Sequence, residues 1–457
     1  MILNKLIYLL PLIALLIYET NGVEDKNPEV GANRYTPDWK SLDSRPLPGW
    51  YDQAKFGIMM HWGVYSVLGL GGEWIWYRWK VAHEFKDYFG KYVKPGVTYQ
   101  DFANEFTTEL FDPNKWADII KASGAKYVVL TTKHHEGFTL WPSNYSWSWN
   151  AMDVGAHRDL VGELSTAVRK AGLRFGTYHS LMEWFHPLFL KDQSNKWKTN
   201  EFVTNKINPE MIELVEKYKP DIIWSDGDAG APDTYWKSLD FLAWLYNDRQ
   251  DEVIVNDRWG GGTACKHGGF YNCKDRYLPS VVQPHKWENA LSVDHGGWSY
   301  TRQFGFNDYM TTYELISQMA QTISCGGNIL INIGPTPDGR IIPLFEEILR
   351  DIGSWMSVNG ESIYGTNPWT HQNDTVTDKV WYTKKEKTVY SIVLFWPKNY
   401  DVILGAVDHN TVQSIQLLGT TGNLVFKAHE DKGTVVTFPF VSPDTLRFAY
   451  VLKINFK

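Results

Sequence analysis

A pair of acidic residues follows a short apolar run in the stretch DIIWSDGD, residues 221–228. The run is strand-like and leads directly into Asp226 and Asp228, which one glycine separates. A carboxylate at the end of a strand either caps the next helix or takes part in a reaction. Asp228 has the stronger claim to the capping role, so Asp226 is the carboxylate that we expect to do chemistry.

Other polar residues with catalytic or binding chemistry follow apolar runs in the same way. They are His61, His134, His135, Tyr178, His179, Trp224, Asp257, Arg258 and Trp259. If the fold brings these side chains together at the ends of the strands, they could bind a metal ion or a sugar. A zinc site calls for HExxH or a comparable spacing, whereas KHHEGF places two histidines side by side, so we expect no metal. A polyhydroxylated ring needs many short donors and acceptors and an indole against its C–H face, and this set provides both.

Hydrolysis of a glycosidic bond normally uses two carboxyl groups. Asp226 is the natural nucleophile, because a rigid strand end would hold it against the anomeric carbon. Trp224 lies two residues earlier and points to the same side of the strand, where it could form part of the pocket wall. The site predicted from these residues is therefore that of a glycosidase.

Strand-like runs alternate with helix-like segments through residues 50–340. The runs are FGIMMHWG (56–63), KYVVLTTKHHEGF (126–138), LRFGTYHS (173–180), DIIWSDGD (221–228), EVIVNDRWG (252–260) and GNILINIGP (327–335). Between or after them, apolar residues recur with helical spacing over 113–125, 157–172, 208–218 and 343–358. Near-continuous apolar strands with functional residues at their ends favour an eight-stranded (β/α) barrel. The competing doubly wound sheet usually binds nucleotides, and neither GxGxxG nor GxxxxGK(S/T) follows a strand.

The texture of the sequence changes after about residue 366. Alternating apolar and polar residues run through 379–397, 414–428 and 432–441, with KKEK and TTGN as turns. This pattern predicts a separate C-terminal β-sandwich. We therefore expect a catalytic (β/α) barrel domain over residues 23–364 and the β-sandwich over 365–457.

Composition excludes several classes of function. Aromatic residues make up 15% of the chain, with 22 Trp and 25 Tyr, which is typical of proteins that stack apolar faces against sugar rings. The net charge is −7 and no long basic block occurs, so we expect no nucleic-acid partner. The first 22 residues read as a secretory signal peptide, and no later run is long enough to span a membrane.

The few cysteines are consistent with a secreted protein. Cys265 and Cys273 are eight residues apart and could close a local disulfide, which leaves Cys325 over. Asn144 and Asn373 each begin an Asn-X-Ser/Thr sequon and are candidate glycosylation sites. One or two sequons arise by chance in a chain of this length, so they add little.

Nine stretches of this chain resemble the α-L-fucosidases of glycoside hydrolase family 29, most closely the animal lysosomal or secreted enzymes. They are FGIMMHWG, GGEWIWYRW, KYVVLTTKHHEGFTLWPS, HRDLVGEL, YHSLMEWFHP, YKPDIIWSDGD, PDTYWKS, VIVNDRWG and GGNILINIGPTPDGRI. The resemblance covers the chain from about residue 30 into the C-terminal domain. It implies a retaining hydrolase that removes α-linked L-fucose from glycans through a covalent fucosyl-enzyme intermediate, without a cofactor.

The resemblance also assigns roles to individual residues. It makes Asp226 the nucleophile. The residues that it implies for the fucose pocket are His61, Glu73, Trp74, His134, His135, Tyr178, Trp224 and Arg258. The position of the acid/base varies within the family, and two candidates follow NDRWG: Asp275, which we prefer, and Glu288, the alternative.

Three classes of function remain compatible with the residues and with the resemblance. The first is an active fucosidase acting on fucosylated glycans, and retention of Asp226, Asp275 and Glu288 favours it. The second is a fucose-binding protein without turnover on the same fold, and the third a metal-dependent barrel hydrolase. By analogy with the animal enzymes we expect a homo-oligomer in the lysosome or the extracellular fluid, without a membrane contact after signal cleavage.

Overall fold

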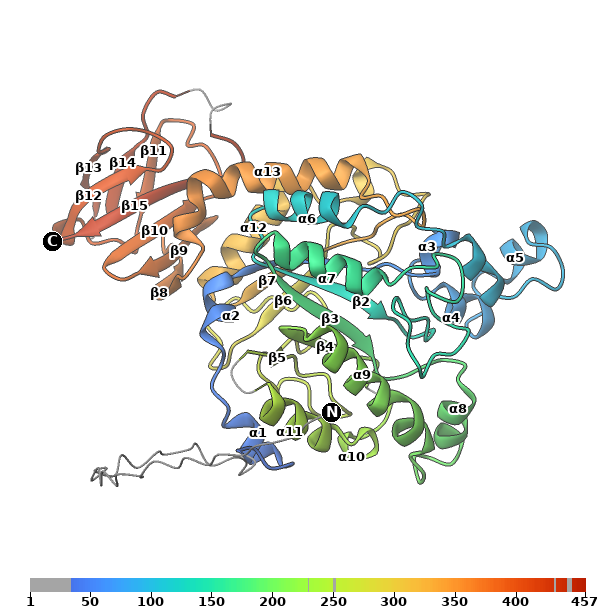
Figure 1. Ribbon diagram of the computed structural model, residues 1–457. Helices are drawn as coiled ribbons and strands as arrows, with labels where there is room; N and C mark the ends of the chain where they lie inside the picture. Colours follow the sequence, from blue (N-terminus) through green and yellow to red (C-terminus); the bar gives the residue numbers. More distant parts are fainter. Residues whose placement is uncertain (1–33, 229, 250–251, 431–432, 442–445) are drawn as a thin grey trace, which may run out of the picture. The chain divides into compact units, whose positions relative to one another are not determined.

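Seven parallel strands form the central sheet of the protein, in a computed structural model that describes residues 34–228, 230–249, 252–430, 433–441 and 446–457 (Figure 1). Their order across the sheet is β5-β4-β3-β2-β1-β7-β6. The strands are β1 Phe56–Met60, β2 Tyr127–Lys133, β3 Arg174–Ser180, β4 Ile222–Asp226, β5 Ile254–Val255, β6 Glu288–Ser292 and β7 Asn328–Ile333. Six of them coincide with the apolar runs of the sequence. The sequence does not predict β6, which begins at a glutamate and has asparagine as its second residue.

An irregular segment, residues 269–272, lies between the edge strands β5 and β6. The backbone N–H of Phe270 donates to the carbonyl of Val255 at 3.1 Å, and the carbonyl of Tyr271 accepts the N–H of Glu288 at 2.9 Å. The regular sheet in the described residues thus has seven strands where eight were expected. Hydrogen bonds from segment 269–272 connect the two edge strands of the sheet, β5 and β6.

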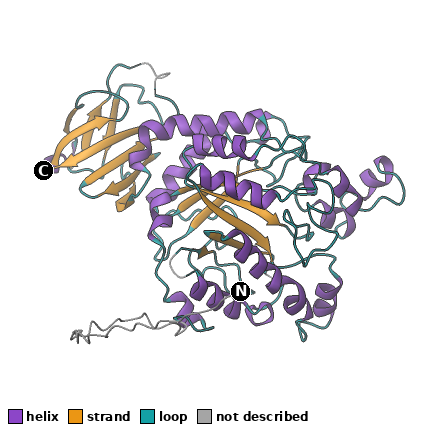
Figure 2. Ribbon diagram, viewed as in Figure 1, coloured by secondary structure: helices purple, strands orange, loops and turns teal. Residues whose placement is uncertain are grey.

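Helices alternate with the strands along the chain and cover the sheet (Figures 1 and 2). They are α1 Trp39–Asp43, α2 Gly49–Ala54, α3 Tyr65–Leu68, α4 Ile75–Lys80, α5 Lys86–Tyr92, α6 Pro113–Ala122, α7 Leu160–Lys170, α8 Pro187–Ser194, α9 Asn208–Tyr218, α10 Asp233–Trp236, α11 Ser238–Asp248, α12 Thr312–Ser324 and α13 Pro343–Asn359. Shorter helical turns are η1 Gln100–Glu105, η2 Val203–Ile207 (a π-helix), η3 Phe306–Asp308, η4 Gly360–Ser362 and η5 His409–Thr411. The helices predicted from apolar spacing are confirmed as α6, α7, α9 and α13.

Three of the covering helices begin at a cap that their own sequence provides. The carboxylate of Asp112 accepts N–H groups at the start of α6, where Pro113 occupies the first position. Asp159 caps α7 in the same way. Thr311 and Glu314 form a capping box at the start of α12. These caps satisfy backbone donors that would otherwise remain unpaired, so they mark where each helix starts.

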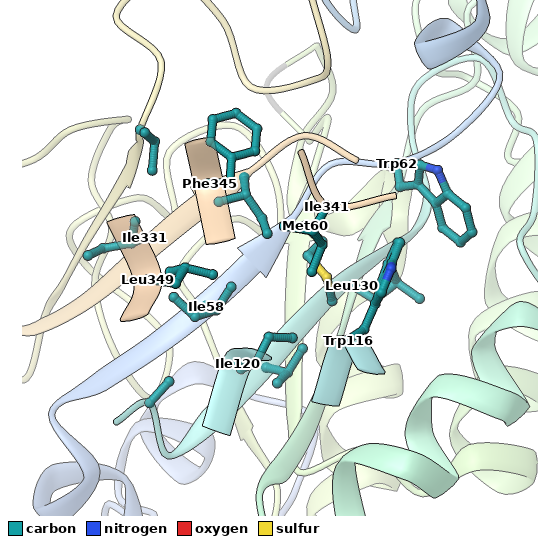
Figure 3. Close-up of a cluster of buried hydrophobic side chains, with 14 of the residues drawn as sticks. Ile58, Met60, Trp62, Trp116, Ile120, Leu130, Ile331, Ile341, Phe345 and Leu349 are labelled. Carbon is teal, nitrogen blue, oxygen red and sulfur yellow. The ribbon is translucent and has the colours of Figure 1, made fainter. Parts of the chain in front are cut away.

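Strand β1 buries side chains on both of its faces. Ile58 and Met60 pack into a cluster with side chains of α6 and α13 (Figure 3). Met59, between them, belongs to a second buried cluster that draws side chains from all seven strands. Full burial of one such side chain stabilises the fold by about 1.5–3 kcal/mol. Burial on both faces explains why these strands are near-continuously apolar.

The C-terminal part of the chain forms two antiparallel sheets. The five-stranded sheet has the order β12-β15-β10-β9-β8, and the three-stranded sheet has the order β11-β14-β13. The strands are β8 Asn367–Asn373, β9 Val380–Lys385, β10 Thr388–Val393, β11 Asp401–Leu404, β12 Val412–Leu417, β13 Val425–Ala428, β14 Thr434–Thr437 and β15 Tyr450–Phe456. One buried cluster contains side chains of both sheets, including Tyr382, Leu404 and Val436.

Contacts between α13 and the end of the chain tie these sheets to the helices before them. The indole N–H of Trp355 donates to the carbonyl of Ala449 at 2.9 Å.

None of the helices in the described part of the chain is long and apolar enough to cross a membrane. The predicted signal peptide, residues 1–22, lies outside the described residues.

Candidate active site

Side chains named from the sequence gather where the parallel strands end. They are His61 after β1, His134 and His135 after β2, Tyr178 in β3, Asp226 at the end of β4 and Arg258 after β5. Parallel strands place their carboxyl ends at one edge of a sheet, which is why residues far apart in sequence meet here. Their contacts define one continuous site.

Asp226 has both carboxylate oxygens engaged. The hydroxyl of Tyr178 donates to Oδ2 at 2.7 Å, and Nη1 of Arg258 donates to Oδ1 at 2.9 Å. Nε2 of His135 lies 3.8 Å from Oδ2. Burial alone would raise the pKa of Asp226, but the charge of Arg258, with smaller effects of His135 and Tyr178, outweighs it and holds the pKa well below its ordinary value. Asp226 is therefore ionised at physiological pH, as a carboxylate nucleophile must be.

Arg258 joins two carboxylates. Its Nη2 donates to Oδ1 of Asp275 at 2.5 Å, while Nη1 holds Asp226. Its guanidinium carbon lies 4.6 Å from the ring centroid of Trp224. Burial opposes the charge of Arg258, but the two carboxylates outweigh burial and raise its pKa above the ordinary value. The two acids differ in access, because the side chain of Asp226 is 21% exposed and that of Asp275 is 51% exposed.

A cleft of about 500 Å³ opens over these two carboxylates. The residues around it include Trp74, His135, Met182, Asp226, Arg258 and Asp275. Glycines 260–262 form another part of the wall. The cleft thus brings an ionised carboxylate, a more exposed carboxylate and an aromatic side chain to one space.

Two histidines of the site are held in one tautomer by neutral partners. Nδ1 of His61 lies 2.7 Å from Oδ1 of Asn332, whose own N–H groups are donated elsewhere. Nδ1 of His135 lies 2.7 Å from the hydroxyl oxygen of Ser180, which donates to a backbone carbonyl. In both cases the partner oxygen accepts, so the ring proton is on Nδ1 and Nε2 carries a lone pair.

Burial keeps these two rings neutral. Burial, with a smaller effect from His134, lowers the pKa of His61 to about 3 and that of His135 well below its ordinary value. His134 packs between aromatic neighbours, with its ring centroid 4.0 Å from that of His135 and 5.7 Å from that of Tyr178. The three imidazoles therefore form a compact group beside Asp226.

Glu73 and Trp74 enter the site from the loop before α4. Glu73 is 7% exposed, and its Oε2 accepts the backbone N–H groups of Trp298 and Ser299 at 3.2 Å each. This buried carboxylate is thus hydrogen-bonded and not left unpaired. The Trp74 ring is 39% exposed and lies 5.3 Å from that of His135.

Glu288 in β6 and Trp224 in β4 are buried among the strands of the sheet and do not border the cleft. Oε2 of Glu288 accepts the hydroxyls of Tyr51 and Tyr127 at 2.7 Å each, and Oε1 accepts the indole N–H of Trp224 at 3.1 Å. Glu288 is 1% exposed, and burial raises its pKa. Trp224 is 3% exposed and stacks on Tyr178 with their centroids 5.5 Å apart. It supports Tyr178 and Arg258 from behind.

The loop that carries Asp275 is organised by Asp257 and a disulfide. The buried carboxylate of Asp257 accepts the N–H groups of Cys265 at 2.8 Å and of Asn272 and Cys273 at 3.0 Å each. Cys265 and Cys273 are joined in a disulfide. In the described part of the chain, Asp257 and these cysteines are the one group close enough to share a metal ion. Disulfide sulfurs carry no thiolate, so the group is a loop anchor.

Asp228 does not cap a helix. Its Oδ2 accepts the N–H of Gly260 at 2.8 Å, whereas α10 begins at Asp233 after Pro232. Burial raises the pKa of Asp228. The expected capping role is therefore wrong, since this carboxylate connects the loops that follow β4 and β5.

A buried ionic cluster beneath the site was not found from the sequence. Nζ of Lys133 contacts Glu183 at 2.7 Å and Glu210 at 3.1 Å, and Lys206 contacts Glu210 at 2.5 Å. Nε2 of His179 lies 3.4 Å from Glu210, so His179 points away from the cleft. Its neighbours in β3, at 178 and 180, face the site, as strand alternation requires. A lysine beside paired histidines at the end of an apolar strand was the one available signal.

The two sequon asparagines lie at the surface. Asn144 and Asn373 are both exposed. The side-chain N–H of Asn144 donates to Glu213 at 2.6 Å, and Asn373 ends β8. Both positions are accessible to modification.

Taken together, a parallel sheet with polar strand ends, two carboxylates joined by an arginine at a cleft, and an exposed tryptophan beside them define a glycoside hydrolase. The family model described as Alpha-L-fucosidase matches residues 23–361, and the one described as Alpha-L-fucosidase C-terminal domain matches residues 372–455. The chain belongs to the α-L-fucosidase family.

Individual relatives agree over nearly the whole chain. An alpha-L-fucosidase of Branchiostoma floridae is 52% identical over 430 residues, which cover 92% of this chain and 96% of the relative. The tissue alpha-L-fucosidase of Homo sapiens is 49% identical over 451 residues, or 97% of each chain. Among solved structures, an alpha-L-fucosynthase from Thermotoga maritima superposes with a TM-score of 0.81 at 32% identity, covering 93% of this chain and 100% of the other.

Proposed function

We propose that this enzyme removes α-linked L-fucose from fucosylated glycans with retention of configuration, and that Asp226 is its nucleophile. One observation carries the assignment: Asp226 ends a buried strand, borders the cleft and is held ionised by Arg258 and Tyr178. A fixed, ionised carboxylate is the group that attacks the anomeric carbon in a retaining glycosidase.

The reaction proceeds in two steps. In the first, an oxygen of Asp226 forms a bond to C1 of fucose while the bond from C1 to the glycosidic oxygen breaks, and the acid/base gives its proton to that oxygen. In the second, the acid/base takes a proton from water, whose oxygen bonds to C1 and displaces Asp226. Arg258 and Tyr178 hold Asp226 in position for both steps.

Asp275 is our candidate for the acid/base. It borders the cleft, its side chain is half exposed, and it shares the guanidinium of Arg258 with the nucleophile. An acid/base must reach both the leaving oxygen and a water molecule. Glu288 is 1% exposed and accepts three hydrogen bonds inside the sheet, which favours a supporting role for it.

The sugar is bound by two imidazoles, by the Glu73 carboxylate and by the Trp74 ring. His61 and His135 each present an Nε2 lone pair, which accepts a hydrogen bond from a hydroxyl. Glu73, which is anchored by two backbone N–H groups, accepts from another. The exposed face of Trp74 packs against C–H groups of the ring or its aglycone.

We further propose that the seven-stranded sheet closes into a (β/α)8-type barrel, in which the irregular segment 269–272 occupies the position of the eighth strand. Two observations support closure: hydrogen bonds link this segment to both edge strands, and one buried cluster draws on all seven strands and on Phe270. The two C-terminal sheets share one buried cluster, which supports a β-sandwich. The domain limits proposed are 23–364 and 365–457.

The chain's route and assembly are proposed by analogy with the animal enzymes of the family. We infer a cleaved signal peptide over residues 1–22, delivery to the lysosome or the extracellular fluid, and a homo-oligomeric state. The sequons at Asn144 and Asn373 are exposed, so N-glycosylation in the secretory pathway could reach both. Mass determination of the secreted protein, before and after removal of N-glycans, tests the cleavage site and both sequons.

Replacement of the nucleophile tests the proposed function. We expect Asp226→Gly to lose at least roughly 10³-fold in kcat on an aryl α-L-fucoside, and azide to restore part of the rate with formation of fucosyl azide. The matched control is Asp240→Asn, an exposed acid on α11, which should behave as wild type. Wild-type protein that binds L-fucose without hydrolysing the substrate would instead indicate a binding protein, and loss of activity to a chelator would indicate metal dependence.

A further inference from the structure

The three imidazoles of the site differ in what faces Nδ1. His61 has the neutral amide oxygen of Asn332 at 2.7 Å, and His135 has the neutral hydroxyl of Ser180 at 2.7 Å. Nδ1 of His134 instead faces a carboxylate, with Oε2 of Glu136 at 3.5 Å. His134 is therefore the one imidazole of the three whose Nδ1 faces an anionic group, whereas His135 meets the Asp226 carboxylate through Nε2.

A tight turn creates this pairing between residues that are two apart in sequence. Strand β2 ends at Lys133, and the N–H of Gly137 donates to the carbonyl of His134 at 3.0 Å. Gly137 adopts φ +80°, which glycine tolerates readily. A continued strand would place both side chains on one face, about two residue rises apart. The turn shortens this separation and brings Oε2 of Glu136 to 3.5 Å from Nδ1 of His134.

Glu136 is buried and incompletely bonded. Its side chain is 1% exposed, and within the described residues neither its Oε2 nor Nδ1 of His134 has a hydrogen-bond partner. The nearby phenols of Tyr65 and Tyr99 have pKa values raised by burial first and by the charge of Glu136 second. A buried carboxylate oxygen without a donor is costly, and Nδ1 of His134, itself unpaired, lies 3.5 Å from it.

We propose that Glu136 is a positioning residue that accepts the Nδ1 proton of His134 and so presents Nε2 to a hydroxyl of the bound sugar. The atoms are a few tenths of an ångström beyond an ordinary hydrogen bond, so a small rotation of either side chain closes the contact. A carboxylate only accepts, and this selects one orientation of the ring and one tautomer. The inference rests on the proposed function, because it concerns binding of the sugar in that site.

Neighbouring rings leave this orientation as the main freedom of His134. Its ring plane is nearly parallel to that of Tyr178, at an interplanar angle of 8°, and Tyr65 meets it edge-on. Stacking fixes the plane but does not distinguish a ring from the same ring turned by 180°. The Glu136 carboxylate makes that distinction, because the turned ring would place a C–H against it.

A double-mutant cycle tests the proposal, with 4-nitrophenyl α-L-fucoside as substrate. We expect Glu136→Gln to raise KM roughly 5- to 50-fold with kcat changed by less than about threefold, because His134 contacts a hydroxyl and not the reacting bond. In a His134→Asn background, Glu136→Gln should have no further effect. Glu136→Asp, which keeps the charge, should recover part of the loss.

Ser180→Ala is the matched control, since it removes the Nδ1 partner of His135 by an equally small change. Its effect should multiply with that of Glu136→Gln, because the two act on different imidazoles. Multiplicative effects of Glu136→Gln and His134→Asn would overturn the proposal, as would equal loss in Glu136→Gln and Glu136→Asp. Calorimetric titration of the same proteins with L-fucose measures the binding without turnover, so it tests the positioning role even if the nucleophile is assigned wrongly.

Discussion

The two sides of the cleft are built in different ways. On the strand side, Asp226 and Tyr178 belong to the regular sheet and His135 follows it directly, and each side chain has a short hydrogen bond. On the loop side, Asp275 is half exposed, and its carboxylate accepts a hydrogen bond from Arg258. A nucleophile needs a fixed distance to the anomeric carbon, whereas an acid/base must serve first the leaving oxygen and then water. The difference in exposure and hydrogen bonding fits the roles proposed for Asp226 and Asp275.

The comparison of the two sides predicts the largest loss of activity when Asp275, the carboxylate on the loop side, is replaced. We expect Asp275→Asn to lower kcat/KM roughly 10²- to 10⁴-fold for fucosides with a poorly acidic leaving alcohol, because only those need a proton from the enzyme. The loss should be much smaller for an activated aryl leaving group. Rates for a series of leaving groups measure this dependence.

Glu288→Gln is the control for that series, because both side chains are carboxyls of the same chain segment. We expect it to lower the thermal midpoint, since a buried acceptor of three hydrogen bonds is altered, and to leave the dependence on the leaving group as in wild type. The reverse result, with the leaving-group dependence appearing in Glu288→Gln only, would move the acid/base to position 288.

A smaller effect is expected from removing the guanidinium that joins the two sides. Arg258→Met leaves Asp226 buried without its main counter-charge, so its pKa rises, and the acidic limb of kcat/KM moves to higher pH. We expect a loss of about 10- to 100-fold near neutral pH. Activity measured from pH 3 to 8 shows the shift, and an unchanged acidic limb would mean that Arg258 does not control Asp226.

The same pair has a consequence for stability. Asp226 has a depressed pKa in the folded state, so its contribution to stability is present above the unfolded value of about 3.9 and is lost as the pH falls further. Arg258→Met should therefore show its full loss of stability above about pH 4. Below that, the two proteins should differ less and less as the pH falls toward the depressed folded pKa of Asp226. Urea unfolding at a series of pH values from neutral to strongly acidic compares them.

The strand side of the site could be predicted from sequence, and the loop side only in outline. Apolar runs that end in polar residues placed His61, His135 and Asp226 at one sheet edge, because the parallel arrangement leaves few alternatives. β6 was missed because Glu288 and Asn289 interrupt its apolar pattern. The partners of Nδ1, such as Asn332 and Ser180, depend on packing between strands, which no local pattern encodes.

Charged groups beneath the site were the least predictable. Lys133 meets Glu183 and Glu210, which follow it by 50 and 77 residues. Their burial depends on mutual pairing, because each alone would be too costly to remove from water. In the sequence, Glu183 and Glu210 read as ordinary surface residues, and only Lys133, at the end of an apolar run, gives a signal. The same holds for Glu136, whose role depends on a turn that only the structure reveals.

The smallest effect concerns the disulfide on the loop side. Cys265→Ala with Cys273→Ala removes a cross-link whose stabilisation is about 2–3 kcal/mol for so short a loop. We expect kcat/KM to fall only a few-fold, because the carboxylate of Asp257 still accepts three N–H groups of the same loop and keeps Asp275 near Arg258. Kinetics and thermal unfolding of the double variant, with and without reductant, measure both effects.

Asp257→Asn separates the two anchors of this loop. It keeps the disulfide but replaces one carboxylate oxygen by an NH2 group, which cannot accept, so at least one of the three backbone N–H groups loses its acceptor. The remaining amide oxygen also accepts less strongly than a carboxylate. If Asp257 is the main anchor, this variant loses more activity than the one without cysteines, and the loss again depends on the leaving group, as in Asp275→Asn. If the cysteine variant loses as much as Asp275→Asn, the covalent link and not the carboxylate positions the acid, and the loop side is held as firmly as the strand side.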